Sequence, residues 1–344
     1  MSTRIDLRSD TVTRPTPRMR RAMAEAEVGD AEYDDDPSVR ALQDRCADVT
    51  GKDAAIYLVT GTMCNQVALH VLARPGNFVT AAAGSHLSGV ELATSSLLAG
   101  VAFRQVAAPD GVMTPEQVTE ALEPDADRGP VVDLVAVENT FSAGGGVPWP
   151  LEALRKVRAV ARAAGLPLYM DGSRVFNASV ATGVSVADYA AEADAVMFCL
   201  SKGLGAPIGS VLCGSTDFVE RARATKILYG ISWRQAGITA AAGLVALDES
   251  PQGLHDDHEN ARRLAGLIAD RTPGATDPAA VPTNILFADP GVVGLRANEA
   301  ATRLAALGVL VNVVGDRVRF VTHRDVSTGD IEAAAEAWGR IGDG

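Results

Sequence analysis

Two short segments decide the fold of this chain: Tyr169-Met170-Asp171-Gly172-Ser173-Arg174 and Phe198-Cys199-Leu200-Ser201-Lys202-Gly203-Leu204-Gly205-Ala206-Pro207. In the first, an apolar run typical of a buried strand ends in an acid, and in the second a similar run leads to a lysine and a glycine-rich turn. The 31 residues from Asp171 to Lys202 leave room for one helix and one strand. We therefore expect both side chains at the same edge of a parallel sheet, where such folds bind ligands.

Lysine is rare in this chain, which makes Lys202 informative. Of the 31 lysines and arginines, only Lys52, Lys156, Lys202 and Lys226 are lysines. An amine can form an imine with an aldehyde, whereas a guanidinium cannot. The position of Lys202 at a strand end, where solvent should be scarce, is typical of a Schiff-base lysine. Pyridoxal phosphate is the cofactor that needs one.

The regular alternation of short apolar runs with helical stretches, from residue 54 to 215, predicts an α/β fold. Because these runs are apolar on both parities, we expect a mostly parallel seven-stranded sheet with helices on both faces. The predicted strands are Ala55–Val59, Phe78–Ala82, Val101–Ala107, Val132–Glu138, Leu166–Met170, Ala195–Leu200 and Gly209–Cys213.

The two ends of the chain are interpreted as separate parts. We predict an N-terminal arm over residues 1–40, a large α/β domain over 41–250 and a small α+β domain over 251–344. The expected elements of these ends are helices near Pro17–Ala26, Asp256–Arg271 and Ala297–Leu307 and strands near Asn284–Phe287, Leu310–Val314 and Val318–Val321, the last two joined by a Gly-Asp turn.

Composition narrows the classes of partner. The 344 residues carry a net charge of −12, which argues against nucleic acid and against an anionic membrane surface. We find no apolar leader and no run long enough to span a bilayer. Cys46, Cys64, Cys199 and Cys213 are scattered, so we expect reduced thiols in a cytoplasmic protein. The histidines show no metal-ligand spacing; His255 and His258, three apart among acids, are interpreted as a solvated helix face, and we expect no metal.

Three further features surround the predicted ligand edge. Gly61 and Thr62 follow the first predicted strand and begin a helix, which favours an anion there, although Thr60 or Thr62 could be an ordinary N-cap. Asp171 could keep a pyridine nitrogen protonated, or could cap a loop. Arg174 could neutralise Asp171 or bind a substrate carboxylate. Their order along the chain is more specific than any one of them.

Longer motifs run nearly from end to end of the chain. They are Ile5–Thr13, Val28–Pro37, Gly61–Gln66, Glu138–Thr140, Asp171–Ala178, Leu200–Pro207, Arg234–Gly237 and Arg319–His323. In these the chain resembles the threonine aldolases of the aromatic amino acid β-eliminating lyase/threonine aldolase superfamily. The resemblance implies the aspartate aminotransferase fold (fold type I) with pyridoxal phosphate as cofactor.

The resemblance also implies roles for individual residues. Lys202 would form the Schiff base, Asp171 would pair with the pyridine nitrogen, and His86 would stack over the ring as a further catalytic group. Gly61, Thr62 and Arg174 would complete the cofactor site. The substrate carboxylate would be bound by Ser9, Arg174 and Arg319.

The implied activity is cleavage of an L-β-hydroxy-α-amino acid, such as threonine or allo-threonine, to glycine and an aldehyde. β-Elimination, transaldol transfer or carbon–carbon bond formation on the same fold are alternatives, as is a non-catalytic cofactor-binding protein. The family is typically tetrameric, with sites completed across a dimer interface. We therefore expect a homo-oligomer, dimer or tetramer, in which Tyr33 and the arm would fit such an exchange.

Four positions depart from the family pattern. Phe141 replaces a histidine near the substrate's β-substituent and is expected to line an apolar pocket. Together with Trp233 of Gly230-Ile231-Ser232-Trp233, it suggests a bulkier substrate such as phenylserine, the alternative being sequence drift within a low-specificity enzyme. A family lysine falls on Ile227. The adjacent Lys226 could contact the phosphate from a neighbouring subunit, but is interpreted as a surface cation. Val90 replaces a tyrosine. The group that removes the β-hydroxyl proton would then be His86 or an ordered water.

Overall fold

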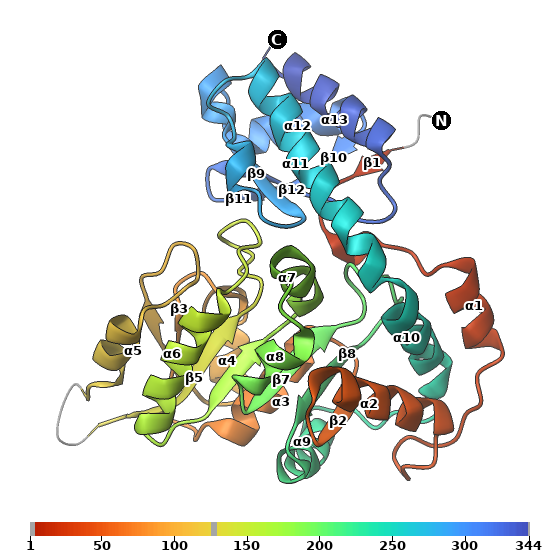
Figure 1. Cartoon of the computed structure of the whole chain (residues 1–344), viewed down its shortest axis with the longest axis vertical. Helices are drawn as coiled ribbons and strands as arrows, with labels where there is room; N and C mark the ends of the chain where they lie inside the picture. The colour runs from red at the N-terminus through yellow and green to blue at the C-terminus, as the bar shows by residue number, and fades with distance from the viewer. Residues whose placement is uncertain (1–3, 125–128, 343–344) are drawn as a thin grey trace.

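The computed structural model describes residues 4–124 and 129–342. A large α/β unit carries the main sheet, and a smaller α+β unit lies above it in the view of Figure 1. The long helix α11 (Leu254–Arg271) leads from the end of α10 (Gly237–Glu249) into the smaller unit. None of the helices among the described residues is long and apolar enough to cross a membrane.

The large sheet has the strand order β2-β8-β7-β6-β5-β3-β4. Only β8 runs against the others, because it pairs antiparallel with both β2 and β7 while the remaining pairs are parallel. All seven predicted strands are confirmed, with ends shifted by at most two residues. Their bounds are β2 (Ala54–Leu58), β3 (Phe78–Ala82), β4 (Ala102–Val106), β5 (Val132–Glu138), β6 (Leu168–Asp171), β7 (Ala195–Cys199) and β8 (Ser210–Gly214).

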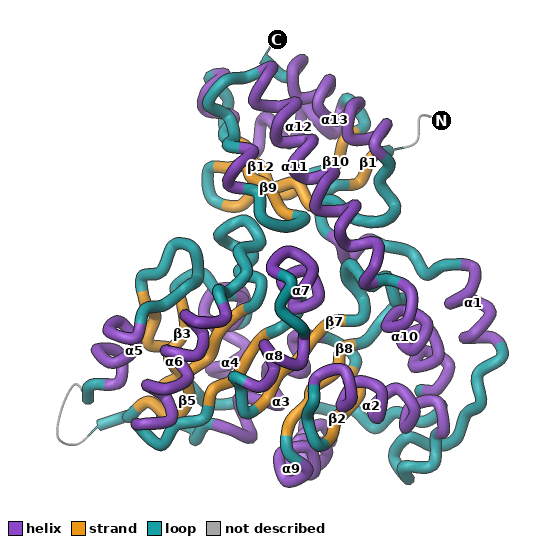
Figure 2. The backbone as a smooth tube through the Cα atoms, in the orientation of Figure 1, coloured by secondary structure: helices purple, strands orange, loops and turns teal. Residues whose placement is uncertain are grey.

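Helices cover both faces of this sheet (Figure 2). Along β7, Val196 and Phe198 face one apolar cluster while Met197 and Cys199 face the other, so each strand is buried on two sides. The helices of the arm and the large unit, besides α10, are α1 (Pro17–Ala24), α2 (Pro37–Thr50), α3 (Gly61–Leu72), α4 (Leu92–Leu98), α5 (Pro115–Leu122), α6 (Leu151–Ala163), α7 (Val175–Thr182), α8 (Val186–Ala191) and α9 (Thr216–Leu228).

The smaller unit is built on a three-stranded antiparallel sheet of order β11-β12-β9. The strand expected over Leu310–Val314 is divided in two, and its first part, β10, pairs in parallel with β1 from the start of the arm. The division into 1–40, 41–250 and 251–344 stays a prediction. The remaining bounds are β1 (Ile5–Asp6), β9 (Ile285–Ala288), β10 (Val309–Leu310), β11 (Asn312–Val314), β12 (Arg317–Val321), α12 (Ala297–Ala306) and α13 (Thr328–Arg340).

Candidate active site

The predicted ligand edge of the large sheet holds a cavity of about 220 Å³. It lies where β6 and β7 end and α3 begins, so parallel topology brings together residues far apart in the sequence. Its lining includes Thr60, Gly61, Thr62, Asn65, His86, Glu91, Asp171 and Lys202. Five of the residues singled out from the sequence, namely Gly61, Thr62, His86, Asp171 and Lys202, therefore share one cavity.

The N-terminal end of α3 forms one wall of this cavity. Thr60 is the N-cap, because its side chain accepts the Met63 backbone N–H at 3.2 Å. The N–H groups of Gly61 and Thr62 belong to the first turn and have no acceptor within the helix. Gly61 also lets the helix approach β7 closely, since a Cβ there would lie 2.9 Å from the Cys199 sulfur. This end of α3 therefore presents free donors and a positive dipole to the cavity.

Asp171 lies at the end of β6 and is 2 % exposed. One carboxylate oxygen accepts the Asn65 side-chain amide at 2.9 Å, and the other accepts the Ser173 backbone N–H at 3.1 Å. Asp171 thus does form a local loop contact, but it also faces the cavity, so the two roles expected for it are compatible.

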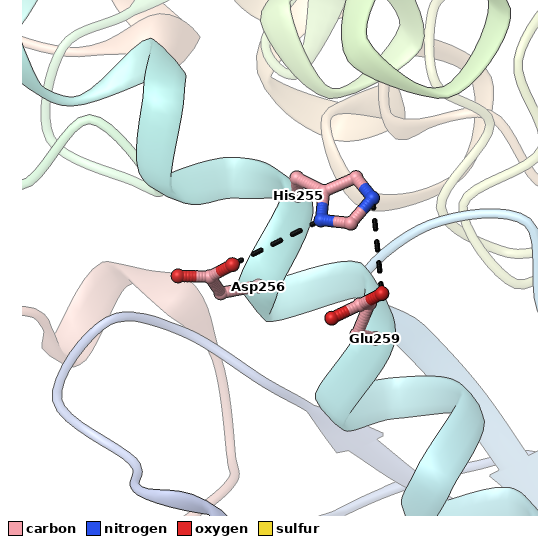
Figure 3. A group of neighbouring side chains, drawn as sticks. All are labelled: His255, Asp256 and Glu259. Carbon is pink, nitrogen blue, oxygen red and sulfur yellow. Dashed lines mark ion pairs between the residues drawn. The ribbon is translucent and has the colours of Figure 1, made fainter.

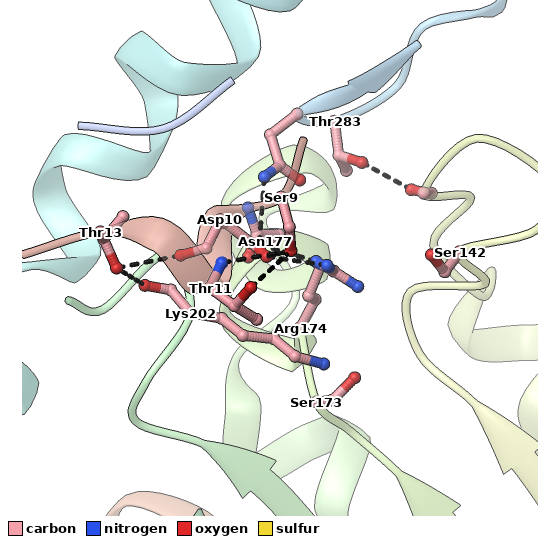
Figure 4. Close-up of polar contacts among 12 residues, drawn as sticks. Ser9, Asp10, Thr11, Thr13, Ser142, Ser173, Arg174, Asn177, Lys202 and Thr283 are labelled. Carbon is pink, nitrogen blue, oxygen red and sulfur yellow. Dashed lines mark hydrogen bonds and ion pairs between the residues drawn. The ribbon is translucent and has the colours of Figure 1, made fainter. Parts of the chain in front are cut away.

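Arg174 makes its ion pair with Asp10 and not with Asp171 (Figure 4). Its Nε and Nη2 donate to the two oxygens of Asp10 at 2.7 and 2.8 Å, and both residues are buried. Burial alone would raise the pKa of Asp10, but the Arg174 guanidinium, together with Lys202 and Asn284, outweighs burial and holds this pKa well below its usual range. Of the two roles considered for Arg174, neutralising Asp171 was therefore wrong, and binding a substrate carboxylate stays a prediction. The sequence analysis missed Asp10 as its partner, although Asp10 stands within one of the quoted motifs.

The arm and the smaller unit bring Ser9 and Arg319 to the same region. Ser9 caps the 3₁₀ turn Asp10–Val12 by accepting the Thr11 N–H at 3.2 Å. The Nη2 of Arg319, on β12, donates to the Arg8 carbonyl at 3.3 Å, whereas its buried Nε has no hydrogen-bond acceptor among the described residues. Burial, followed by the nearby Arg174, lowers the pKa of Arg319. The site therefore contains a half-buried cation whose buried Nε is an unused donor among the described residues.

Thr13 joins the arm to the loop that carries Lys202. Its hydroxyl lies 2.9 Å from the backbone carbonyl oxygens of both Asp10 and Lys202 (Figure 4). The arm thus contacts the large unit next to the lysine, which places Asp10 and Lys202 on neighbouring segments.

His86 is held on two sides. Its backbone N–H donates to Glu138 at 2.6 Å, and its ring Nδ1 lies 2.7 Å from Glu91 Oε1. The hydrogen bond to Glu91 raises the pKa of His86, and burial opposes it. Burial, together with the nearby Asp171, raises the pKa of Glu138. The sequence analysis assigned no role to Glu138 or Glu91. For Glu91, its position five residues after His86 was the feature that could have indicated a contact.

Phe141 and Trp233 do not share a pocket. The Phe141 side chain is 1 % exposed and packs in the core of the large unit, where added Cβ atoms at Gly111 and Gly144 would collide with it. Trp233 packs edge-on against Tyr57, with ring centroids 5.0 Å apart. The expectation that the two rings build an apolar substrate pocket was therefore wrong for this chain.

Lys226 and His258 are buried, contrary to expectation. Lys226 is 5 % exposed and pairs with Glu32 of the arm at 3.3 Å, so it is not a surface cation. His258 shares a hydrogen bond of 3.1 Å between its Nε2 and the Asn177 amide, and burial lowers its pKa to about 4.

His255 alone of that histidine pair lies on the solvated face of α11. It stands near Asp256 and Glu259, with ring nitrogens 3.9 and 3.8 Å from their oxygens (Figure 3). All three side chains are exposed, and such acidic groups are common on helices without any ion.

A larger groove of about 680 Å³ lies between the arm and the smaller unit. Arginines and acids line it, including Arg4, Arg14 and Arg324, but its lining contains neither Lys202 nor Asp171. Because Lys202 and Asp171 line the smaller cavity at the strand ends, that cavity is the better candidate for the active site.

Comparison with known proteins gives a consistent result. Residues 6–290 match the family model described as beta-eliminating lyase. The chain is 40 % identical to the probable low-specificity L-threonine aldolase 2 of Arabidopsis thaliana, over 98 % of this chain and 97 % of that protein. It is 39 % identical to the low specificity L-threonine aldolase of Escherichia coli K12, over 97 % and 98 %. The solved threonine aldolase of Leishmania major superposes with a TM-score of 0.82 at 19 % identity, covering 98 % and 99 %, and so shows the same fold.

Proposed function

Because the chain belongs to the beta-eliminating lyase family, and within it to the threonine aldolases, we propose that it cleaves an L-β-hydroxy-α-amino acid to glycine and an aldehyde. L-Threonine and L-allo-threonine are the proposed substrates, since the relatives named for L-threonine match the chain over nearly its whole length. The buried position of Phe141 removes the reason for preferring a bulkier substrate. The observation that carries the proposal is the single cavity shared by Lys202, Asp171 and His86.

The donor set of this cavity fits pyridoxal phosphate. Lys202 offers the amine, Asp171 a buried carboxylate, and the first turn of α3 at Gly61 and Thr62 the free N–H groups that a phosphate needs. When bound, this cofactor supplies an aldehyde for the lysine and a ring that accepts electrons from the substrate. Asn65 holds Asp171 by one oxygen at 2.9 Å, which fixes the direction in which the carboxylate faces.

The second half of the proposal concerns the substrate carboxylate. Asp10 accepts from Nε and Nη2 of Arg174, so within residues 4–124 and 129–342 the Nη1 of Arg174 and the buried Nε of Arg319 are donors left without an acceptor. Arg319 has no carboxylate partner among these residues, and an amino-acid carboxylate would supply one while also accepting from Nη1 of Arg174. Binding of this kind fixes which bond at the substrate Cα is broken, and such positioning can contribute roughly 7–11 kcal/mol.

His86 is the proposed acceptor of the β-hydroxyl proton, with an ordered water as the alternative. Its ring lines the cavity, and one ring nitrogen is held by Glu91 at 2.7 Å. Because its pKa is raised, we expect turnover to rise with pH through the titration of this ring.

The test is glycine release by the cofactor-loaded protein from L-threonine, L-allo-threonine and the phenylserine diastereomers. Stoichiometric glycine and aldehyde would support the proposal, with threonine isomers preferred. An oxo acid with ammonia and no glycine would favour β-elimination, the reaction after which the family is described. Absence of any cofactor absorbance after loading would favour the non-catalytic alternative.

We further propose a homo-oligomer, dimer or tetramer, in the cytoplasm. Exposed apolar side chains support an interface: Leu97 and Leu98 on α4 adjoin Leu228 at the end of α9, where the Tyr229 hydroxyl contacts the Leu98 carbonyl at 3.3 Å. Tyr33 of the arm is also exposed, at 78 %. Four free, buried cysteines suit a reducing compartment. Light scattering on the purified protein would give the oligomeric state, and a monomer would contradict this proposal.

A further inference from the structure

A single turn of π-helix, His86–Val90, brings His86 and Glu91 together. The Glu91 backbone N–H donates to the His86 carbonyl at 2.8 Å, which closes a turn of five residues. In an α-helix, residues five apart point in different directions, whereas in this wider turn they lie one above the other. The wide turn is therefore what allows the Glu91 carboxylate to reach His86 Nδ1 at 2.7 Å.

Glu91 is buried and surrounded by donors. Its Oε1 accepts from Asn65 Nδ2 at 3.1 Å and lies 2.7 Å from His86 Nδ1, and its Oε2 accepts from Gln66 Nε2 at 2.7 Å. Each oxygen of Glu91 already accepts one amide N–H, and hydrogen bonds of this kind favour the ionised form of a carboxyl group. An ionised carboxylate can only accept, so the hydrogen of the shared bond lies on His86 Nδ1.

The same contacts connect His86 to the proposed pyridine partner. Asn65 Nδ2 donates to both Glu91 and Asp171, at 3.1 and 2.9 Å, and its oxygen accepts the Tyr169 hydroxyl at 2.7 Å. The two carboxylates, which accept hydrogen bonds, fix the NH₂ end of the Asn65 amide toward them, and the tyrosine hydroxyl donates to the other end. The ring nitrogen Nε2 of His86, in contrast, has no hydrogen-bond partner among residues 4–124 and 129–342.

We propose that Glu91 is a positioning residue, which keeps the hydrogen of His86 on Nδ1 and so leaves Nε2 as the nitrogen that accepts the substrate's β-hydroxyl proton. This inference rests on the proposed aldolase activity. In the step, the hydroxyl proton moves to Nε2 and the O–H electron pair forms the carbonyl bond of the aldehyde. The Cα–Cβ electron pair stays with the glycine fragment, which is later protonated at Cα.

Three charged groups shift the pKa of His86, and a fourth binds its backbone. Glu91 of its own turn and Asp171 at the end of β6 raise its pKa, and Lys202 after β7 lowers it. Glu138 at the end of β5 accepts its backbone N–H at 2.6 Å. Of these, only Glu91 contacts the ring. Removing the charge of Glu91 while keeping its shape should therefore lower the pKa of His86 without moving the other three groups.

The substitution Glu91→Gln removes the charge of Glu91 and keeps its shape. In Glu91→Gln one oxygen becomes an amide nitrogen, which would face the Gln66 donor, but Gln66 Oε1 is buried and unpaired, so a flip of its amide restores the bond. His86 and Asn65 can still donate to the remaining oxygen. We therefore expect Glu91→Gln to fold, with its melting temperature close to that of the parent.

The first readout is NMR of histidine labelled with ¹⁵N in the ring, with and without pyridoxal phosphate, with His86 assigned from a His86→Asn variant. We expect the parent His86 to be neutral with its hydrogen on Nδ1 at high pH, and its titration midpoint to fall by about one pH unit in Glu91→Gln. Glu120→Gln, the same change on the exposed face of α5, is the matched control and should leave the midpoint unchanged.

The second readout is the pH profile of glycine release. In Glu91→Gln the acid limb of kcat should move to lower pH with the NMR midpoint, because a proton acceptor must be deprotonated to act, while KM changes less than about twofold. A hydrogen on Nε2 in the parent, or an unmoved midpoint in Glu91→Gln, would overturn the proposal. A shifted midpoint with an unmoved acid limb would also overturn it. If the parent released no glycine, the proposed aldolase activity would fail, whereas the NMR result would still decide whether Glu91 fixes the tautomer.

Discussion

Replacing Asp10 by alanine should destabilise the protein and weaken substrate binding together. The substitution leaves Arg174 buried with a full charge, because Asp10 accepts both of its paired N–H groups at 2.7 and 2.8 Å. Asp10 is itself 0 % exposed and Arg174 6 %, so water cannot take over either bond without opening the structure. Asn284, which donates to Asp10 at 3.3 Å, would lose an acceptor as well.

The expected loss can be bounded in two ways. Removing one partner of a buried ion pair typically costs about 3–5 kcal/mol, because the other charge stays behind. Two unit charges about 4 Å apart attract each other by about 4 kcal/mol at an effective dielectric constant of about 20. We therefore expect Asp10→Ala to lower the free energy of unfolding by about 3–5 kcal/mol, and Asp10→Ala combined with Arg174→Ala to lose less than the sum of the two single changes.

The assay is equilibrium urea unfolding at one fixed protein concentration, together with KM for L-threonine. The exposed pair Arg263–Glu332 is the matched control, since breaking it should cost below about 1 kcal/mol. A freed Arg174 should also raise KM while the affinity for pyridoxal phosphate changes little. A loss below about 1 kcal/mol for Asp10→Ala, with KM unchanged, would refute the view that Asp10 holds Arg174 in place.

Three other substitutions test separate parts of the structure. Lys202→Arg keeps the charge but cannot form an imine, so the covalent link to pyridoxal phosphate, followed by absorbance, and glycine release should both disappear; retained turnover would exclude Lys202 as the Schiff-base residue. Burial lowers the pKa of His258 from 6.5 to about 4 in the folded state. Between these pH values the unfolded state binds a proton that the folded state does not. The protein is therefore expected to lose stability as the pH falls from 6.5 toward 4. His258→Gln should remove most of this loss of stability, which amounts to up to about 3 kcal/mol. The measurement is the free energy of unfolding in urea at pH 7 and at pH 4.5. An equal loss between these pH values in the parent and in His258→Gln would contradict the prediction. Burial, aided by Asp10, raises the pKa of Asp257 from 3.8 to about 8, so the stability of the protein should fall as the pH rises between these values. Asp257→Asn should therefore be about 1–2 kcal/mol more stable than the parent at pH 8 and equally stable near pH 4. Equal stability at pH 8 would contradict the prediction, because the ionised acid would then cost nothing.

Apolar periodicity was sufficient to predict the large sheet, since strands buried on both faces leave an unbroken signal in the sequence. The smaller unit was predicted less fully. Helix α13 was missed, although Ser327 and Asp330 form a capping box at its start and an apolar stripe follows. The predicted strand over 310–314 is divided because its first part leaves the antiparallel sheet and pairs with β1, which lies about 300 residues away. Local patterns carry no information about such a partner.

The residues around the candidate cavity were predictable because they stand next to strands and helices that the sequence itself predicts. Lys202, Asp171 and Gly61 follow strands or begin a helix, so their positions in the fold follow from the order of the elements. Side chains without such an anchor were misplaced. Lys226 looks like a surface cation until Glu32 of the arm covers it, and Phe141 looks like a pocket residue until Gly111 and Gly144 leave room for its ring.

The two halves of the site therefore depend on different parts of the molecule. The proposed cofactor half is formed mainly by strand ends and helix starts of the large unit, and Thr11 of the arm also lines its cavity. The proposed substrate half would need three segments: Arg174 from the large unit, Asp10 from the arm and Arg319 from β12. Since Asp10 orients Arg174 and the arm is held beside Lys202 by Thr13, loosening the arm should impair substrate binding before cofactor binding. An Asp10→Ala protein that bound the cofactor normally but had a raised KM would show the two halves to be separable. A parallel loss of both would mean that the arm is also part of the cofactor site.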